Sequence, residues 1–137
     1  LESGEPGARR PRMIADAQIT FLPVADLGRS RYFYEGVLGL ELVLDQGSCH
    51  IFRVSDAGYI GTCINEDAAA AAGVIVRFVT EDVDGWCARI VEGGHAIERG
   101  PEHSDRFGIY HAFLRDPDGH LIEIQRFDDP DWSAAPK

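Results

Sequence analysis

The feature that most constrains this fold is a ten-residue stretch near the C-terminus, Arg115-Asp116-Pro117-Asp118-Gly119-His120-Leu121-Ile122-Glu123-Ile124. Pro117 fixes φ at the second position of a type I turn, and Gly119 can take the left-handed conformation that follows. A turn of this kind closes a three-residue hairpin loop with a bulge. The stretch therefore predicts two antiparallel strands joined by a tight turn, with Leu114 opposite Ile122.

The register of this hairpin divides its side chains between two faces. Successive side chains on a strand point to opposite sides of the sheet, and the bulged register keeps the apolar ones together. The apolar face carries Ala112, Leu114, Ile122 and Ile124. The other face is polar and aromatic and carries His111, Phe113, Glu123 and Gln125. We expect helices to cover the first face and the second face to line a site.

Composition narrows the classes of partner. The chain has 137 residues and a formal net charge of −10, which disfavours binding to nucleic acid or to an anionic membrane. No apolar run approaches about 20 residues, so no membrane span is predicted. The three cysteines, an odd number without the spacing of a metal knuckle, are interpreted as free thiols in a reducing compartment. We therefore expect a cytoplasmic protein.

The rest of the chain follows one pattern twice, a strand, a helix and three strands. Asp26 and Asp82 each follow a strand and are expected to cap a helix. The first helix should run to about residue 36 or 38 and stop at Gly39, and the second should span 83–92. Strands are predicted at 17–24, 40–44, 49–54, 59–64, 74–79, 96–99, 109–115 and 120–126. This repetition predicts two modules of the form βαβββ.

These elements define one domain over residues 14–127, made of module one (14–66) and module two (73–127). Residues 1–13 are predicted to be a disordered leader and 128–137 a loose tail, from which Trp132 docks. The Ala-rich segment 68–72 is interpreted as a short helix or linker. The polar loop predicted at 100–108 is long for a hairpin connection and is interpreted as a solvated loop or, alternatively, as a lid over a binding site.

The two modules can be aligned on the glycines of their last turns, Gly58 and Gly119, at an offset of 61 residues. This alignment places two histidines and two phenylalanines in register and puts Thr62 on Glu123. If the modules pair about a pseudo-twofold axis, the mixed faces of both sheets line one cleft. The predicted lining is His50, Phe52, Thr62, His111, Phe113, Glu123 and Gln125.

The motifs Leu22-Pro23-Val24-Ala25-Asp26-Leu27, Phe33-Tyr34 and Val37-Leu38-Gly39-Leu40, with the closing hairpin, resemble the vicinal oxygen chelate superfamily. This superfamily includes glyoxalase I, bleomycin-resistance proteins, fosfomycin-resistance enzymes and extradiol dioxygenases. The resemblance covers about residues 14–127. It implies an α+β fold in which two βαβββ modules form a cup-shaped, partly open barrel. It also implies a frequent homodimer and often a divalent metal in the cup.

The metal positions that this resemblance implies are mostly occupied by residues that cannot bind a metal. Ile19 and Ile75 stand at the usual first-strand ligand positions, with Gln18 beside the former. The last-strand carboxylate is present as Glu123, but its expected partner is Thr62. Catalytic zinc usually takes three protein ligands. We therefore expect no metal centre of the usual kind and no cofactor, and a divalent metal is the alternative.

Two alternative roles remain for the polar residues of the cup. His50, His111 and Glu123 could form a displaced two-His-one-carboxylate site, with Gln18 as a further candidate ligand. Without metal, Glu123 and His111 could instead act as an acid–base pair beside a carbonyl. The carboxylate of Glu123 could also be paired with a ligand amine or with a neighbouring arginine.

The sequence thus predicts a protein that binds a small hydrophobic or aromatic molecule in the cup without the usual metal. The alternative is a lyase, isomerase or dioxygenase of the glyoxalase type that uses Glu123 as metal ligand or general base, so whether the protein is an enzyme stays open. Glu123 and His111 are the predicted catalytic residues. The predicted ligand-binding residues are His50, Phe52, Thr62, Phe113, Gln125 and Arg106. The expected partners are a small molecule and a second copy of the chain.

Overall fold

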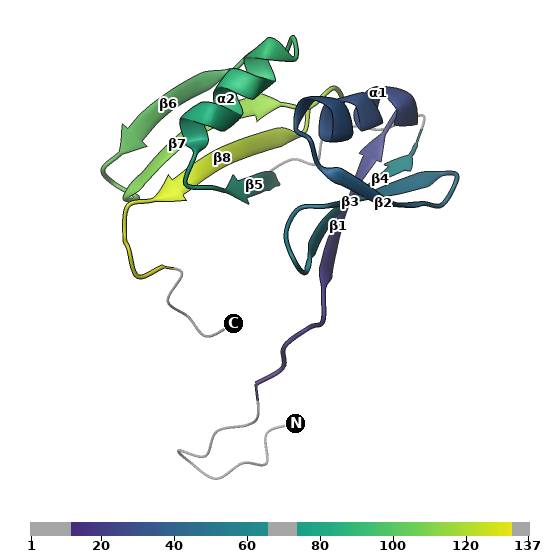
Figure 1. Ribbon diagram of the computed structural model, residues 1–137, viewed down its shortest axis with the longest axis horizontal. Coiled ribbons are helices and arrows are strands. Elements are labelled where there is room, and N and C mark those ends of the chain that lie inside the picture. The colour runs from purple at the N-terminus through teal and green to yellow at the C-terminus, as the bar shows by residue number, and fades with distance from the viewer. Residues whose placement is uncertain (1–11, 66–73, 133–137) are drawn as a thin grey trace.

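The computed structural model describes residues 12–65 and 74–132 (Figure 1). Most of the predicted leader, the Ala-rich segment and the end of the tail lie outside the described residues. The first module contains β1 (Gln18–Val24), α1 (Leu27–Arg31), the π-helix η1 (Tyr32–Val37), β2 (Glu41–Asp45), β3 (Cys49–Arg53) and β4 (Gly58–Ile64). The second contains β5 (Ile75–Val79), α2 (Val83–Glu92), β6 (Arg99–Ser104), β7 (Ile109–Arg115) and β8 (Leu121–Phe127).

Each module forms its own four-stranded mixed sheet. The strand orders are β1-β4-β3-β2 and β5-β8-β7-β6, so the first strand of each module lies at an edge, parallel to the last strand. Figure 1 shows α1 and α2 along the same side of the molecule, each over one face of its sheet. The sheets are not closed into a barrel. The predicted α+β fold of two βαβββ modules is confirmed, and the cup is open.

The helices begin where the sequence predicts. The side chain of Asp26 accepts a hydrogen bond from Arg29 N at 3.0 Å, and that of Asp82 accepts one from Gly85 N at 3.0 Å. These bonds satisfy amide groups that have no partner inside the helix. The first helix stops at Gly39, whose φ of +76° favours glycine. No helix among residues 12–65 and 74–132 is long and apolar enough to span a membrane.

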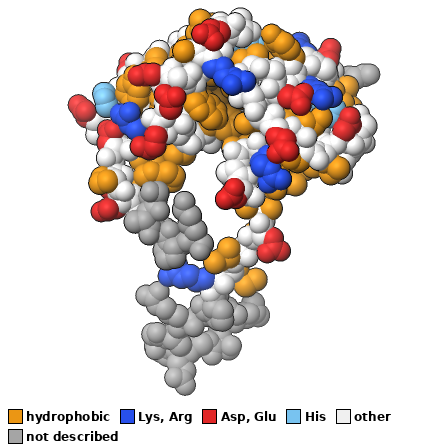
Figure 2. All heavy atoms as spheres, viewed as in Figure 1, with side chains coloured by type: hydrophobic (Ala, Val, Ile, Leu, Met, Phe, Trp, Pro, Cys, Tyr) orange, Lys and Arg blue, Asp and Glu red, His pale blue; other side chains and the backbone are white. Residues whose placement is uncertain are grey.

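One hydrophobic core joins the two modules. It combines the helix-facing sides of both sheets with the apolar sides of the helices, including Phe33, Tyr34 and Phe52 from the first module and Ile90 and Ile124 from the second. Figure 2 shows hydrophobic side chains gathered where the modules meet, with acidic and basic side chains over the outer surface. The shared core fixes the modules to each other and leaves the second face of each sheet without a helix. We call this second face the open face.

The turn of the closing hairpin provides a polar contact between the modules. Tyr34 Oη donates to Asp116 Oδ2 at 2.7 Å, and this bond is buried. Asp118 accepts from Ala25 N and from Arg29 Nη2, both at 2.9 Å. Burial, followed by the charge of Asp116, raises the pKa of Tyr34 well above its ordinary value. The aspartates of the turn therefore position the first helix as well as closing the hairpin.

The predicted strand 96–99 is wrong, and so is most of the predicted loop over 100–108. The strand is β6, Arg99–Ser104, and only a short turn at 105–108 precedes β7. Gly100 (φ +83°) and the cis-proline Pro101 lie where the pairing with β7 shifts register. An edge strand tolerates a proline at such a bulge because its outer side needs no backbone donor. The glycine and proline therefore mark a bulged strand and not a loop.

The prediction of three free thiols is wrong for two of them. Cys49 and Cys63 occupy opposite positions on β3 and β4 and form a disulfide. Cys87 is free and faces the core from α2. Burial raises the pKa of the Cys87 thiol, with a further contribution from Asp84. The pairing of β3 with β4 brings Cys49 and Cys63 together. Their spacing in the sequence does not indicate this disulfide.

Candidate functional site

The site is on the open face of the second sheet, where β5, β8 and β7 lie side by side. The predicted hairpin register is confirmed: Phe113 pairs with Glu123 and His111 pairs with Gln125. Their side chains share the face opposite to the buried, helix-covered residues Ala112, Leu114, Ile122 and Ile124. The adjacent parallel strand β5 contributes Arg77, which pairs with Glu123. Three strands therefore bring polar side chains to one place.

Glu123 is the centre of this arrangement. Its Oε1 accepts from Arg77 Nε at 3.0 Å and lies 2.9 Å from Arg77 Nη2. Its Oε2 lies 2.6 Å from His111 Nδ1. The Glu123 side chain is 2% exposed, whereas that of Arg77 is 47% exposed. A buried carboxylate thus has a partner on each oxygen, and we call Arg77, His111 and Glu123 the polar cluster.

Arg77 was not predicted as a site residue. The sequence predicts a neighbouring arginine only as one alternative partner for Glu123 and does not indicate which arginine. The available signal was the position of Arg77 in the middle of the strand 74–79, where the flanking residues are apolar. Because β5 is an edge strand and Arg77 is 47% exposed, this signal is weak, and only pairing with β8 brings Arg77 beside Glu123.

A cavity of about 410 Å³ lies over the polar cluster. Its volume is within the range of small-molecule sites. Apart from the cluster it is lined mainly by apolar and aromatic side chains. The complete lining is Ile75, Arg77, Phe107, Ile109, His111, Phe113, Glu123, Gln125 and Phe127. The face beneath this cavity therefore offers an apolar surface with a polar centre.

Three residues predicted to line the cup lie elsewhere. His50, Phe52 and Thr62 are on the helix-covered face of the first sheet, where His50 pairs with Thr62. Phe52 is fully buried in the core and contacts Tyr34, with 5.8 Å between ring centroids. The prediction that these side chains face the cup is wrong, and the displaced metal site that included His50 has no geometric basis.

The cause is an error of one residue in aligning the modules. Gly119 takes a left-handed φ of +86°, whereas Gly58 is the first residue of β4 and has no positive φ. The two glycines do not have the same role in their turns. The strand pairings relate the last strands at an offset of 62 residues and the first strands at 56, because Gly61 pairs with Phe21 as Glu123 pairs with Arg77. A one-residue slip moves every side chain of a strand to the other face.

The position in the first module equivalent to the Arg77–Glu123 pair is apolar. The Phe21 ring lies over Gly61 so closely that a Cβ on Gly61 would overlap the ring. Phe21 is exposed on the open face, as is Ile19 next to it on the same side of β1. Around Gly61 the open face of the first sheet is therefore aromatic and aliphatic, and Phe21 stands where the second sheet has Arg77.

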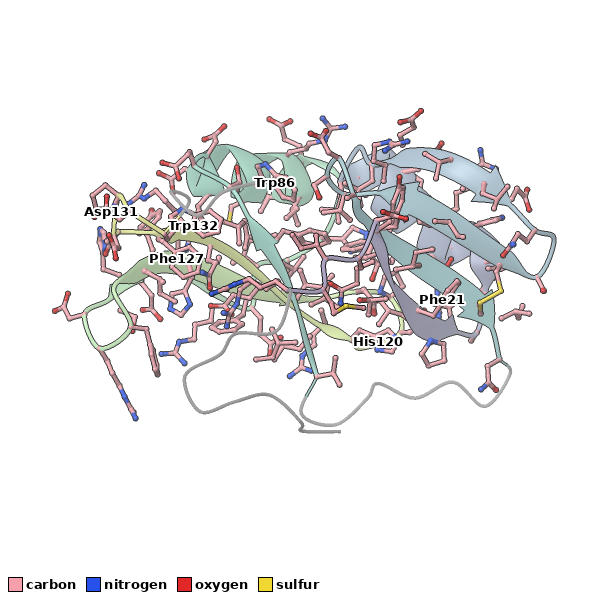
Figure 3. The ribbon with its side chains drawn as sticks, turned by 90° about the horizontal axis from the view of Figure 1, so that it is seen from below. Phe21, Trp86, His120, Phe127, Asp131 and Trp132 are labelled. Atoms are coloured by element: carbon pink, nitrogen blue, oxygen red, sulfur yellow. A yellow bond between two sulfur atoms is a disulfide. The ribbon has the colours of Figure 1, made fainter. Side chains whose placement is uncertain are left out.

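The remaining predicted residues lie at the edges of the site. Arg106 is in the turn between β6 and β7, over the ring of Phe107 at 5.0 Å, and does not line the cavity. The expectation that Trp132 docks is confirmed, because its ring stacks on Phe127 with 4.6 Å between centroids (Figure 3). Through Phe127 this contact is continuous with one end of the cavity lining.

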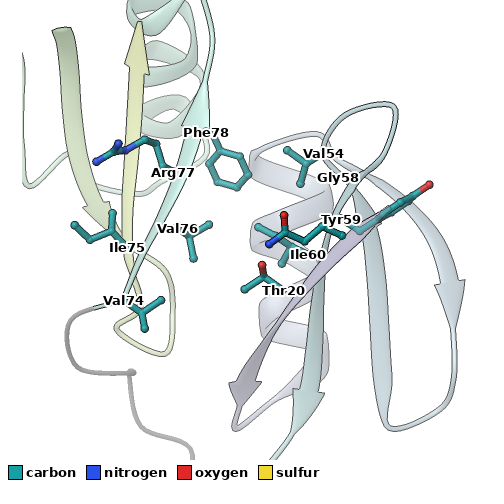
Figure 4. Close-up of a pocket in the computed structure, with 11 residues that line it drawn as sticks. Thr20, Val54, Gly58, Tyr59, Ile60, Val74, Ile75, Val76, Arg77 and Phe78 are labelled. Carbon is teal, nitrogen blue, oxygen red and sulfur yellow. The ribbon is translucent and has the colours of Figure 1, made fainter. Parts of the chain in front are cut away.

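A second cavity of about 220 Å³ lies between the modules (Figure 4). It is bordered on one side by β1 and β4, through residues such as Thr20 and Ile60, and on the other by β5, through Val76 and Phe78. Its walls are mainly apolar. The contrast with the cavity over the polar cluster identifies the latter as the candidate site.

The residues of the open faces do not fit the divalent metal that the family often carries. Ile19, Gly61 and Ile75 stand at three of the four positions and have no donor atom on their side chains. The fourth, Glu123, already has Arg77 and His111 on its two oxygens. A guanidinium at this distance opposes a second cation. Among the described residues, no three His, Cys, Asp or Glu side chains converge as a metal-binding group.

The chain has two paired βαβββ modules, and each sheet has a helix on one face and an open second face. This architecture is shared by a whole class of proteins. The sequence matches the profile of the Glyoxalase/Bleomycin resistance protein/Dioxygenase superfamily over residues 17–124. The chain belongs to this superfamily. The expected resemblance is thereby confirmed. No curated protein sequence matched the chain.

Solved structures agree with this assignment. A glyoxalase/bleomycin resistance protein from Albidiferax ferrireducens T118 is 29% identical, with a TM-score of 0.64 over 79% of this chain and 95% of that one. A virulence protein from Salmonella typhimurium is 25% identical, with a TM-score of 0.67 over 85% and 99% of the two chains. A putative glyoxalase family protein from Bacillus anthracis shares the fold at 14% identity, with a TM-score of 0.71 over 86% and 99%.

Proposed function

We propose that this protein binds a small, flat, largely apolar molecule in the cavity over the polar cluster, without a metal ion. The observation that carries the proposal is the state of Glu123. Its two oxygens are occupied by Arg77 and His111, so the carboxylate acts as a structural anchor of the cavity floor. The aromatic residues around it provide the surface on which a planar ligand packs.

A second copy of the chain would complete the site. The open face of the first sheet exposes apolar side chains, including Ile19 and Phe21, which are 41% and 48% exposed. An exposed apolar face of this kind is typical of an interaction surface. Placed over the cavity of a partner, it would close the cup with an aromatic wall opposite the polar cluster. We therefore propose a homodimer, and light scattering of the purified protein tests it directly.

Acid–base catalysis by His111 is the second candidate function. Nδ1 of His111 faces Glu123 Oε2 at 2.6 Å, whereas no hydrogen bond to Nε2 is found among the described residues. If Nδ1 carries the proton, Nε2 is the basic nitrogen, and it belongs to a residue that lines the cavity. Glu123 then orients His111 instead of acting as the base itself. A reaction of this kind removes a proton next to a carbonyl group.

A ligand screen by thermal shift tests the binding proposal, because a ligand that binds only the folded state raises its stability. The test variant is Phe107→Ser, which removes an aromatic ring that is 65% exposed at the cavity. The control is Tyr32→Ser, which removes a ring that is 61% exposed on η1, outside the cavity. We expect Phe107→Ser to weaken binding of each hit by about tenfold, or about 1.4 kcal/mol. Equal binding by both variants would contradict the proposed site.

Cytoplasmic location stays a prediction. The bridge between Cys49 and Cys63 argues against a reducing compartment, because structural disulfides are rare there. Counting free thiols in protein extracted under acid-quenched conditions would decide between the two environments: one free thiol indicates an oxidising compartment and three a reducing one.

A further inference from the structure

We infer that the ligand of this cavity carries a neutral amide group, such as a carboxamide or lactam, which is recognised by Gln125. This inference rests on the proposed binding function and specifies its ligand class. It starts from a polar side chain for which the protein supplies no partner. Gln125 lines the cavity from β8, on the same face as Glu123 and directly opposite His111.

Gln125 is fully buried, and neither its Oε1 nor its Nε2 has a hydrogen-bond partner among the described residues. A buried amide without partners is unfavourable, and native structures rarely contain one unless water or a ligand completes it. The neighbouring positions of the face show the contrast. Glu123 and His111 satisfy each other, and Arg77 takes the remaining carboxylate oxygen. Gln125 is therefore the one member of this polar row whose hydrogen bonds are left for water or a ligand to supply.

The chemistry of the side chain selects the ligand group. A glutamine amide presents one acceptor oxygen and two donor hydrogens side by side. A second amide is its complement, because it offers a donor to Oε1 and an acceptor to Nε2 at the same spacing. A carboxylate offers only acceptors and would leave Oε1 unpaired. A ketone also offers only an acceptor and leaves Oε1 unpaired, and unlike a carboxylate it carries no charge.

The charge of the cavity excludes a preference for an anion. Arg77 would favour a carboxylate, but its guanidinium is paired with Glu123 at 2.9 Å. The two charges cancel, so a neutral ligand suits the face better than an ionic one. Phe107, Phe113 and Phe127 surround this centre and fit an aromatic ring attached to the amide.

Three probes that share one aromatic ring distinguish an amide, a carboxylate and a ketone as the recognised group: benzamide, benzoate and acetophenone. Their dissociation constants are measured by ligand-observed NMR with the wild-type chain and with Gln125→Met, which keeps the side-chain volume and removes both polar groups. For the wild type we expect benzamide to bind at least about tenfold more tightly than the other two, because a site with buried polar groups rejects analogues that leave them unpaired. In Gln125→Met we expect this preference to disappear while acetophenone binds as before.

Thermal unfolding of Gln125→Met separates recognition from folding. We expect no loss of melting temperature, because the amide has no protein partner to lose. The inference is overturned if acetophenone binds the wild type as well as benzamide does, if benzamide shows no binding at millimolar concentration, or if the preference survives in Gln125→Met. Failure of the binding function itself has a different signature, in which Phe107→Ser leaves the affinity of every probe unchanged.

Discussion

The two modules differ most at one equivalent position on their open faces. In the second module Arg77 lies beside Glu123, and in the first Phe21 covers Gly61. The strand pairings are otherwise the same, with the first strand parallel to the last and a helix capped by aspartate in between. One repeated scaffold therefore carries a polar face in one half and an aromatic face in the other.

This difference shows how a symmetric fold produces an asymmetric site. A metal held between the modules would need donor atoms from both open faces, and at the expected positions the first module has Ile19 and Gly61, whose side chains carry no donor atom. The second module retains the carboxylate but neutralises it internally with Arg77 and His111. The cavity over the polar cluster is therefore lined by the second module alone, with a polar centre among apolar and aromatic side chains.

The largest predicted effect comes from removing the arginine of the polar cluster. Arg77→Met leaves Glu123 buried with only His111 as partner, and we expect a loss of about 3 kcal/mol in unfolding free energy. Chemical denaturation measures it. The control is Arg53→Met, which breaks a pair with the exposed carboxylate of Glu41 and should leave stability nearly unchanged. Equal effects of both substitutions would show that Arg77 has no special role.

The second largest loss of unfolding free energy is expected from a substitution at the junction of the modules. Tyr34→Phe removes the buried bond to Asp116, and we expect a cost of about 2 kcal/mol. Because folding raises the pKa of Tyr34, its contribution is fully present below the unfolded value of about 10 and is lost as pH rises above it. Unfolding free energy measured from pH 8 to 11 should fall more for the wild type than for Tyr34→Phe. Parallel curves would contradict this assignment.

A smaller loss of unfolding free energy is expected at Gly61, the first-module position equivalent to Glu123. Gly61→Ala places a methyl group against the Phe21 ring and should cost about 1 to 2 kcal/mol. Adding Phe21→Ala should remove most of that penalty, because the methyl group then has room. Measuring both single variants and the double variant gives the coupling between the two positions. Additive effects would show that Phe21 does not lie over Gly61.

The smallest losses of unfolding free energy are expected at the aspartate helix caps, a feature that both modules share. Asp26→Ala and Asp82→Ala each remove one helix cap, and we expect a loss of about 1 kcal/mol from each. The two sites have no common partner, so the double variant should show the sum of the single effects. Thermal or chemical unfolding of the three variants measures this. A clear excess in the double variant would mean that the caps are coupled through the shared core.

Much of the fold could be predicted because its signals are local. The turn at Pro117 and Gly119 set the register of the closing hairpin, and the helix Val83–Glu92 has both its cap and its stop nearby in sequence. The strand β6 was missed because Gly100 and Pro101 have the local signature of a loop, and only pairing with β7 makes them a bulged edge.

Half of the candidate site could be predicted from the sequence and half could not. Glu123, His111, Phe113 and Gln125 belong to one hairpin, so a correct turn placed all four on one face. The first module had no such turn, and a slip of one residue turned its side chains to the wrong face. Arg77 reaches Glu123 only through the pairing of strands 46 residues apart in sequence, which no local pattern encodes.

The metal content of the purified protein tests the central claim most directly. The protein is prepared without a chelator and without a metal-affinity step, and the wild type is compared with Glu123→Ala by elemental analysis. A cavity floor in which Glu123 is held by Arg77 and His111 predicts far less than one equivalent of iron, manganese, nickel or zinc in both samples. One equivalent of metal in the wild type that is lost in Glu123→Ala would contradict it and would make Glu123 a metal ligand.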